Sequence, residues 1–190
     1  MRRAVPILAL LTALSACGNE RQRPPRAPEA AEPSGRRTVE LPRYGVSFVR
    51  PANWPLTPPR PPQIAAVNSG RVSVNLWRYR RDERLPRTAS ELQRARRALI
   101  AAARARDRSL KVLSARSVRV GGAPGVELVA DEKIGVARRK VRSTHLYAHG
   151  AELVIDAYAP PAEFAAVDRG VFAPLLRSLR VRRPAARGRP

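Results

Sequence analysis

Cysteine is nearly absent from this sequence, and its one thiol stands at Cys17. A disulfide within the chain is therefore excluded, as is a metal site built from several thiolates. Histidine is also scarce, because only His145 and His149 are present, four residues apart in a segment with strand-like alternation. Four residues of strand extend about 13 Å, too far for both rings to hold one metal ion. We expect no metal site and no cofactor.

Acidic residues are few, and lysine is rarer still. The chain of 190 residues has 37 basic and 15 acidic side chains, a formal charge of +22, with lysine only at positions 111, 133 and 140. A GC-rich genome would explain arginine in place of lysine, but it would not explain the scarcity of acids. A charge of this size favours contact with anionic surfaces.

Long apolar runs are missing except at the start of the chain. Arg2 and Arg3 precede the apolar stretch 4–14, which is long enough for a signal peptide and too short to span a bilayer. The run Leu14-Ser15-Ala16-Cys17 then has the lipobox pattern of a leucine, two small residues and a cysteine. The alternative is an ordinary signal peptide with an incidental cysteine, but the chain offers no second cysteine to pair with it.

This start resembles the signal sequences of bacterial lipoproteins. The resemblance implies cleavage after Ala16 and addition of diacylglyceryl and fatty-acyl (palmitate) chains to Cys17, which anchor the protein on the extracytoplasmic side of the cell membrane. Gly18 carries no inner-membrane retention signal, so the choice between inner and outer membrane stays open. An exported, tethered protein does not meet nucleic acid, so we expect no nucleic-acid partner.

The remaining chain divides by composition. Residues 17–36 are rich in proline, alanine and charge and have no apolar periodicity, which predicts a flexible tether. The composition of residues 183–190 predicts a disordered basic tail. One domain is expected over 37–182. Its alternating segments predict a first pair of strands around 42–45, a hairpin around 68–70, and four further strands at about 110–120, 125–131, 136–148 and 151–158. A second helix is expected from Pro160, interrupted at Gly170 and Pro174.

The main helix is predicted to begin at Thr88 and to end near Arg108. Thr88 and Glu91 have capping-box spacing. At 100° per residue, four arginines gather on the side opposite the apolar face, namely Arg94, Arg97, Arg104 and Arg108. This arginine stripe has two interpretations, a solvated helix face or a surface that binds anionic lipid or cell-wall polymer. Arg96 and Arg106 fall on the apolar flank and should extend outward.

These elements form an α+β pattern, an antiparallel sheet of about six strands flanked by two helices. The segments "YGVSFVRPANW", "LPRTASEL", "V-GG-PG-E" and "FAPLLRSLRV" resemble the PsbP-like α/β/α sandwich superfamily, and among its members the LpqN-type lipoproteins. The resemblance covers about residues 37–182. It implies the fold, and because the superfamily includes photosystem accessory proteins, a Ran-binding protein and exported lipoproteins, it implies no single activity.

Candidate chemistry is sparse. Ser143, His145 and Asp156 contain the residue types of a hydrolytic triad, but no G-x-S-x-G elbow is present, and structural roles are the preferred interpretation. The glycines of "VGGAPG" lie between two strands and predict a turn rather than a phosphate cradle. We therefore predict a non-enzymatic binding or accessory module of the cell envelope, with an unknown envelope protein as a possible class of partner. The alternative is a hydrolase or transferase that acts on envelope lipid or glycan.

Overall fold

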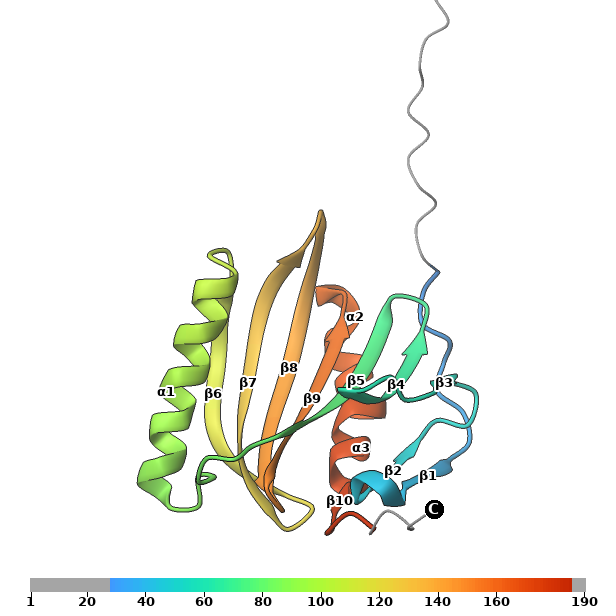
Figure 1. Cartoon of the computed structure of the whole chain (residues 1–190). Helices are drawn as coiled ribbons and strands as arrows, with labels where there is room; N and C mark the ends of the chain where they lie inside the picture. The colour runs from blue at the N-terminus through green and yellow to red at the C-terminus, as the bar shows by residue number, and fades with distance from the viewer. Residues whose placement is uncertain (1–27, 186–190) are drawn as a thin grey trace, which may run out of the picture.

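The computed structural model describes residues 28–185 (Figure 1). The predicted signal peptide 1–16 and the predicted lipidation site Cys17 lie outside this range. The elements follow in the order β1 (Arg37–Leu41), the 3-10 turn η1 (Pro42–Tyr44), β2 (Val46–Arg50), β3 (Leu56–Thr57), β4 (Gln63–Ser69), β5 (Val72–Arg80), α1 (Ala89–Arg106), β6 (Lys111–Val120), β7 (Ala123–Ile134), β8 (Ala137–Ala148), β9 (Ala151–Ala159), α2 (Pro161–Val167), the π-helix η2 (Asp168–Phe172), α3 (Ala173–Ser178) and β10 (Arg180–Val181).

The strands form two antiparallel sheets. The larger has seven strands in the order β3-β4-β5-β9-β8-β7-β6, and the smaller has three in the order β1-β2-β10. The α+β class with an antiparallel sheet and flanking helices is therefore confirmed. The sequence predicted a single sheet of about six strands. This prediction missed the two-residue strands β3 and β10, which are too short to show alternation, and it did not include the division into two sheets.

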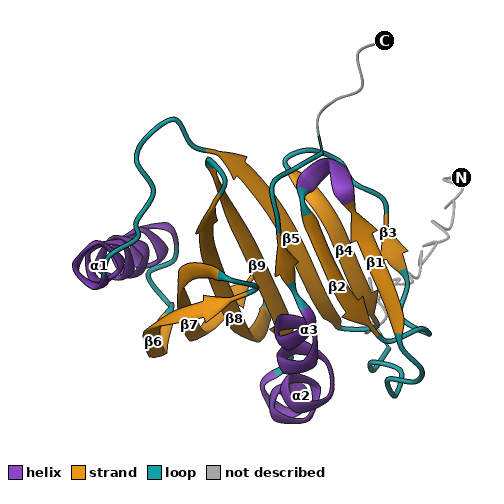
Figure 2. Cartoon of the chain, turned by 90° about the horizontal axis from the view of Figure 1, so that it is seen from below, coloured by secondary structure: helices purple, strands orange, loops and turns teal. Residues whose placement is uncertain are grey.

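Helices cover both faces of the large sheet (Figure 2). The α1 helix packs over β6 and β7 through a small core that includes Ala103, Leu128 and Val141. On the opposite face, α2, η2 and α3 fill the space between the large and small sheets, where Phe48 and Phe172 belong to the main core. Burial of this apolar surface, at roughly 25 cal/mol per Å², is what holds the layers together.

The α1 helix begins as the sequence predicts. Thr88 is the N-cap, its hydroxyl accepts from the Glu91 N–H at 3.3 Å, and the Glu91 carboxylate accepts from the Thr88 N–H at 2.9 Å. These hydrogen bonds lower the pKa of Glu91 to about 2. The helix ends at Arg106, so Arg108 lies outside it.

The last helical run is continuous, which corrects the predicted interruption. Backbone angles stay right-handed helical from Val167 through Ala173, and the Ala173 N–H donates to the Asp168 carbonyl across a widened π turn. Pro174 stands in the first turn of α3, where a missing N–H costs little. Gly170 is accommodated inside the π turn and does not end the helix.

The predicted boundaries of the domain are too narrow. Residues 28–36 were expected to belong to the tether, but the Ala31 carbonyl accepts from the Trp54 indole N–H at 3.0 Å and the Ala31 N–H donates to the Ser69 hydroxyl at 2.8 Å. At the other end, the Ala185 N–H donates to the Pro42 carbonyl at 2.9 Å. These segments contact the domain through their backbone groups, and such contacts require no hydrophobic periodicity in the sequence. Composition alone therefore did not predict that residues 28–36 and Ala185 contact the domain.

Candidate functional site

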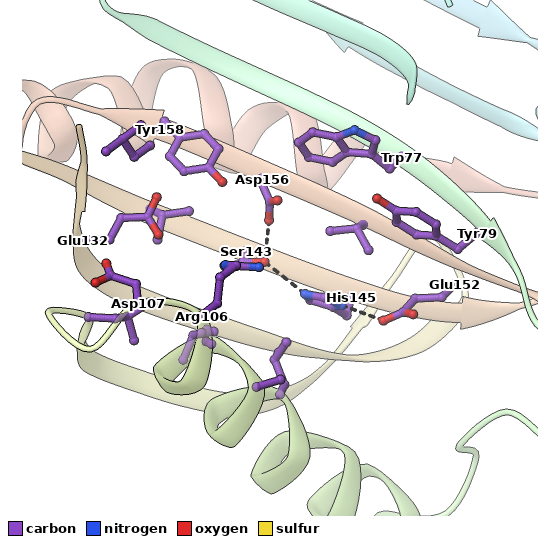
Figure 3. Close-up of a pocket in the computed structure, with 18 of the residues that line it drawn as sticks. Trp77, Tyr79, Arg106, Asp107, Glu132, Ser143, His145, Glu152, Asp156 and Tyr158 are labelled. Carbon is purple, nitrogen blue, oxygen red and sulfur yellow. Dashed lines mark hydrogen bonds and ion pairs between the residues drawn. The ribbon is translucent and has the colours of Figure 1, made fainter. Parts of the chain in front are cut away.

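A groove of about 850 Å³ lies between α1 and one face of the seven-stranded sheet (Figure 3). Because α1 covers only the β6–β7 side, the same face of β8, β9 and β5 stays open beside it. Its floor contains the apolar side chains Leu128, Val141 and Val154. Trp77 and Tyr79 of β5 line one part of the groove, and Asp107 and Glu132 line another.

Strand alternation selects the side chains that enter this groove. On β9, Leu153, Ile155 and Ala157 belong to the main core, so Val154 and Asp156 point to the opposite face. That division of faces confirms the alternation read from the sequence. On β8, Ser143 pairs directly with Asp156 across the ladder, and His145 pairs with Val154. The pairing brings the three polar side chains onto neighbouring positions of one face.

A chain of hydrogen bonds runs through the centre of the groove. The Ser143 hydroxyl donates to the Asp156 carboxylate, and Ser143 Oγ lies 3.1 Å from His145 Nε2. His145 Nδ1 lies 2.6 Å from Glu152 Oε1. Arg81 completes the chain, because its Nε donates to Glu152 Oε2 at 3.0 Å and its Nη2 contacts the same oxygen. Four strand residues and one loop residue thus form a single polar network.

Burial and hydrogen bonding shift the two carboxyl groups in opposite directions. Burial raises the pKa of Asp156, and the hydrogen bond from Ser143 only partly offsets this effect. Burial also acts to raise the pKa of Glu152, but the hydrogen bonds from His145 and Arg81 outweigh it, so the pKa of Glu152 is lowered. Glu152 is therefore the fixed negative charge of the network, and Asp156 is the group that favours a proton.

The proton positions bear on catalysis. When Asp156 is ionised, the single Ser143 proton is donated to Asp156, so Ser143 Oγ can only accept from His145 Nε2. A general base would need the reverse direction, with the hydroxyl donating to the ring. Ser143 also lies in β8, an inner strand paired on both sides, whose backbone N–H groups are used in the ladders. An oxyanion hole requires free donors aimed at the reacting oxygen.

The remaining titratable groups lie near the C-terminal end of α1. Burial raises the pKa of Glu132, and burial likewise raises the pKa of the Tyr158 hydroxyl beside Asp156. The pKa of Asp107 is lowered, mainly by the hydrogen bonds from Ser109. This part of the groove therefore combines the carboxyl groups of Asp107 and Glu132 with two basic side chains, the exposed Arg106 on its α1 wall and Lys133.

The arginine stripe lies away from the groove. Arg94, Arg97 and Arg104 are exposed on the outer side of α1, and Arg108 is exposed in the turn that follows the helix. Arg96 lies on the apolar flank as predicted and donates to the Ala115 carbonyl at 3.3 Å. Whether the stripe binds an anionic surface stays a prediction.

Sequence reasoning found Ser143, His145 and Asp156 but missed Glu152. The signal was present in the turn, because His149-Gly150 joins β8 to β9 and pairs Tyr147 with Glu152. This register places Glu152 diagonally opposite His145 on the groove face. His149 itself occupies the turn with a φ of 51°. Trp77, Tyr79 and Arg81 carried no sequence signal, because only the pairing of β5 with β9 brings them to this face.

Three further features of the described residues concern metal ions, membrane spans and the predicted glycine turn. Within residues 28–185, no group of three or more histidine, cysteine or carboxylate side chains is arranged to hold a metal ion. No helix in the same range has both the length and the apolar character needed to cross a bilayer. "VGGAPG" forms the β6–β7 turn, as predicted, with Val120 paired to Ala123.

Solved structures with the same architecture identify the fold. Cyanobacterial PsbP (CyanoP) from Synechocystis sp. PCC 6803 superposes with a TM-score of 0.59 at 11% identity, covering 89% of this chain and 99% of that chain. The fold is PsbP-like. No family model and no curated protein sequence matches the chain, so this assignment depends on three-dimensional similarity.

Two other structures share the PsbP-like fold. LpqN, involved in cell envelope biogenesis of Mycobacterium tuberculosis, has a TM-score of 0.51 at 15% identity, covering 77% of this chain and 90% of that chain. The Saccharomyces cerevisiae Ran-binding protein Mog1p has a TM-score of 0.52 at 12% identity, with coverages of 78% and 96%. At these identities the PsbP-like fold is shared and the ligands are not implied.

Proposed function

We propose that the protein is a non-enzymatic binding or accessory module of the cell envelope, anchored on the extracytoplasmic side of the membrane through lipidated Cys17. The lipobox pattern supports the anchor, and the PsbP-like fold, shared with a Ran-binding protein and with LpqN, which is involved in cell envelope biogenesis, is compatible with a binding role. Its partner would be an envelope component, either a small molecule, a cell-wall polymer or a protein.

The groove between α1 and the sheet is the observation that carries this proposal. Its volume of about 850 Å³ is in the range of small-molecule sites. An apolar floor, the aromatic side chains Trp77 and Tyr79, and a central polar network provide the usual mixture of desolvation and orienting hydrogen bonds. The network is held by its own internal bonds, so it is preorganised before a ligand arrives.

The alternative is a hydrolase or transferase, and one observation favours it. Ser143 lies within hydrogen-bond distance of His145, and His145 within hydrogen-bond distance of Glu152. This is the spatial order of a nucleophile, a general base and the acid that orients the base. While Asp156 is ionised, however, the Ser143 hydroxyl donates its proton to Asp156, and the strand that carries Ser143 is paired on both sides. We therefore place the network in a binding role and use the same serine to test the enzyme alternative.

The binding proposal is tested by blocking the groove. Ala102 is exposed on α1 and lines the groove, whereas its neighbour Ala101 is exposed outside it. The full chain is purified from the envelope of a bacterium that expresses it, and native mass spectrometry records any bound small molecule. We expect an adduct on the wild type and on Ala101→Trp, and its loss on Ala102→Trp. Identical spectra for all three proteins would contradict the groove as the binding site.

The enzyme alternative has a separate readout. The same preparations are assayed for hydrolysis of p-nitrophenyl acetate and p-nitrophenyl butyrate. We expect the rate of Ser143→Ala to equal that of the wild type, because Ser143 is not activated. A rate in the wild type that depends on Ser143 and His145 would replace the binding proposal by the hydrolase.

A further inference from the structure

The tip of the β7–β8 hairpin exposes apolar side chains to solvent. Ile134 is 53% exposed and Val136 is 97% exposed, and Gly135 between them forms the turn with a φ of 59°. Single exposed apolar residues are common on protein surfaces, but two at one projecting tip form a compact apolar point. Such a point lowers its free energy when it enters an apolar medium.

Basic side chains surround this apolar tip. The segments 104–111 and 131–140 contain eight basic and three acidic residues. Asp107 Oδ2 accepts from the Lys133 N–H at 3.5 Å, which places the end of α1 directly beside the hairpin. The acids are partly engaged, because Asp107 also accepts from Ser109 and Asp131 lies 3.9 Å from Lys140. Lys133 and Arg138 flank the tip and are exposed.

The first described residues lie at the same end of the molecule. The ladders pair Ser73 with Tyr158 and Tyr158 with Val141, so the β4–β5 turn and the β7–β8 hairpin lie at one end of the sheet. The backbone of Pro28 and Glu29 lies against Gly70 in that turn. In Figure 1 the hairpin tip and the start of the coloured chain both lie at the top. Cys17 precedes Pro28 by eleven residues.

We propose that this end of the molecule docks on an anionic lipid bilayer, with Ile134 and Val136 inserted among the headgroups and the surrounding lysine and arginine side chains on the lipid phosphates. An apolar point within a basic ring matches the two components of such a surface, the apolar boundary and the negative headgroups. Long basic side chains reach the phosphates while the hairpin enters. The inference goes beyond the proposed binding role, and it agrees with the Cys17 anchor without depending on it.

This docking geometry divides the arginine stripe. The α1 helix rises about 1.5 Å per residue, so Arg97 and Arg94 lie about 10–15 Å farther from the hairpin end than Arg104, and Arg108 follows the end of the helix. The screening length at physiological salt is about 8 Å. Arg104 and Arg108 therefore contribute to binding, and Arg94 and Arg97 contribute little.

The test uses the chain from Gly18 to Pro190, which keeps every residue that the structure describes and contains no cysteine. Val136→Cys therefore takes an environment-sensitive fluorophore at one position. Ser117→Cys, exposed on β6 farther from the hairpin, is the control label. With phosphatidylcholine vesicles containing phosphatidylglycerol, we expect the label at 136 to report an apolar environment and the label at 117 to stay in water. Pure phosphatidylcholine should change neither label.

Affinity for the mixed vesicles is then measured by co-sedimentation. Ile134→Ser/Val136→Ser should weaken binding about tenfold, since each aliphatic side chain is partly removed from water on insertion. Leu113→Ser, at another exposed apolar residue, should change it less than twofold. Arg104→Gln/Arg108→Gln should weaken binding more than Arg94→Gln/Arg97→Gln, although both pairs lose the same charge. Circular dichroism verifies that each variant is folded.

Three results would overturn the docking. One is unchanged affinity of Ile134→Ser/Val136→Ser, which would mean that the net charge alone attracts the chain. Another is an aqueous environment for the label at residue 136 in bound protein. The third is an equal loss for both arginine pairs, which would assign contact to the whole face of α1.

Discussion

His145 Nδ1 and Glu152 Oε1 lie 2.6 Å apart across the strands that the β8–β9 turn joins. Glu152 is also the acceptor for Arg81, so one carboxylate holds a ring from β8 and a guanidinium from the loop after β5. The side chain of Glu152 is 10% exposed, which makes its partners difficult for water to replace. This carboxylate is therefore central to the stability of the groove.

Glu152→Gln should destabilise the protein at neutral pH by about 2 kcal/mol, because the hydrogen bonds from its two partners, His145 and Arg81, lose the carboxylate charge. The pKa of Glu152 is below its ordinary value of 4.5 in the folded protein. Its contribution is therefore fully present above pH 4.5 and disappears as the pH falls through the folded pKa. Urea unfolding at pH 7 and pH 3 measures the difference. Glu83→Gln, which removes an exposed partner of the same arginine, is the control. A cost that is the same at both pH values would refute this account.

Asp156→Asn should have the opposite sign and stabilise the protein at pH 7. Burial raises the pKa of Asp156, so its ionised form is disfavoured in the folded state. The stability that comes from the protonated form is complete below the ordinary pKa of 3.8 and is lost as the pH rises through the folded pKa. An amide still accepts from Ser143. We expect a gain on the order of 1 kcal/mol, or roughly 2–4 °C in Tm at pH 7, that vanishes near pH 3. A lower Tm at pH 7 would show that the charge of Asp156 is needed.

Thr144→Val should also stabilise the protein. Thr144 is fully buried on the core face of β8, and its hydroxyl has no hydrogen-bond partner among the described residues. Valine has nearly the same shape and removes the unpaired polar group, which favours folding by about 1 kcal/mol. Thermal unfolding tests this directly, with Ser114→Ala on the exposed part of β6 as control. A decrease in Tm would mean that the hydroxyl is bonded in solution.

Gly125→Ala should be strongly destabilising. A Cβ at residue 125 of β7 would meet the His145 carbonyl of β8 and would lie 2.7 Å from Leu146 Cδ2. Overpacking of this kind costs about 2–3 kcal/mol. Gly170→Ala is the matched control, because its Cβ would lie 3.7 Å from Pro33 Cγ and alanine favours the helix. Chemical denaturation should rank Gly125→Ala well below and Gly170→Ala at or above the wild type. Equal stabilities would show that β7 and β8 can separate.

Cys17→Ser should release the protein from the membrane fraction or block its processing. In the proposed lipoprotein the Cys17 thiol accepts the lipid anchor, and a serine hydroxyl would not replace it. Cells that express the full chain are fractionated, and the membranes are washed with high salt to remove electrostatic binding. If Cys17→Ser stays with the washed membranes as firmly as the wild type, the lipobox interpretation is wrong.

The local features of the chain follow from the sequence because they depend on neighbouring residues. Alternation in "ELVIDAY" places Val154 and Asp156 on one face, and the spacing of Thr88 and Glu91 fixes the start of α1. Short turns such as Gly121-Gly122 require antiparallel pairing. These features predicted the α+β class and the polar side chains of β8 and β9. The prediction that Cys17 carries a lipid anchor likewise depends only on the four residues of the lipobox.

The assembly of the groove was decided by tertiary structure. Alternation defines the face on which a side chain lies but not the strand that will lie beside it. β5 pairs with β9, more than seventy residues farther along the chain, and only this pairing brings Trp77 to Val154 and Tyr79 to Glu152. Because α1 covers only β6 and β7, the same face of β8 and β9 is not covered by a helix. The sequence thus determined which side chains point outward from each strand, whereas long-range pairing and packing determined which of them meet.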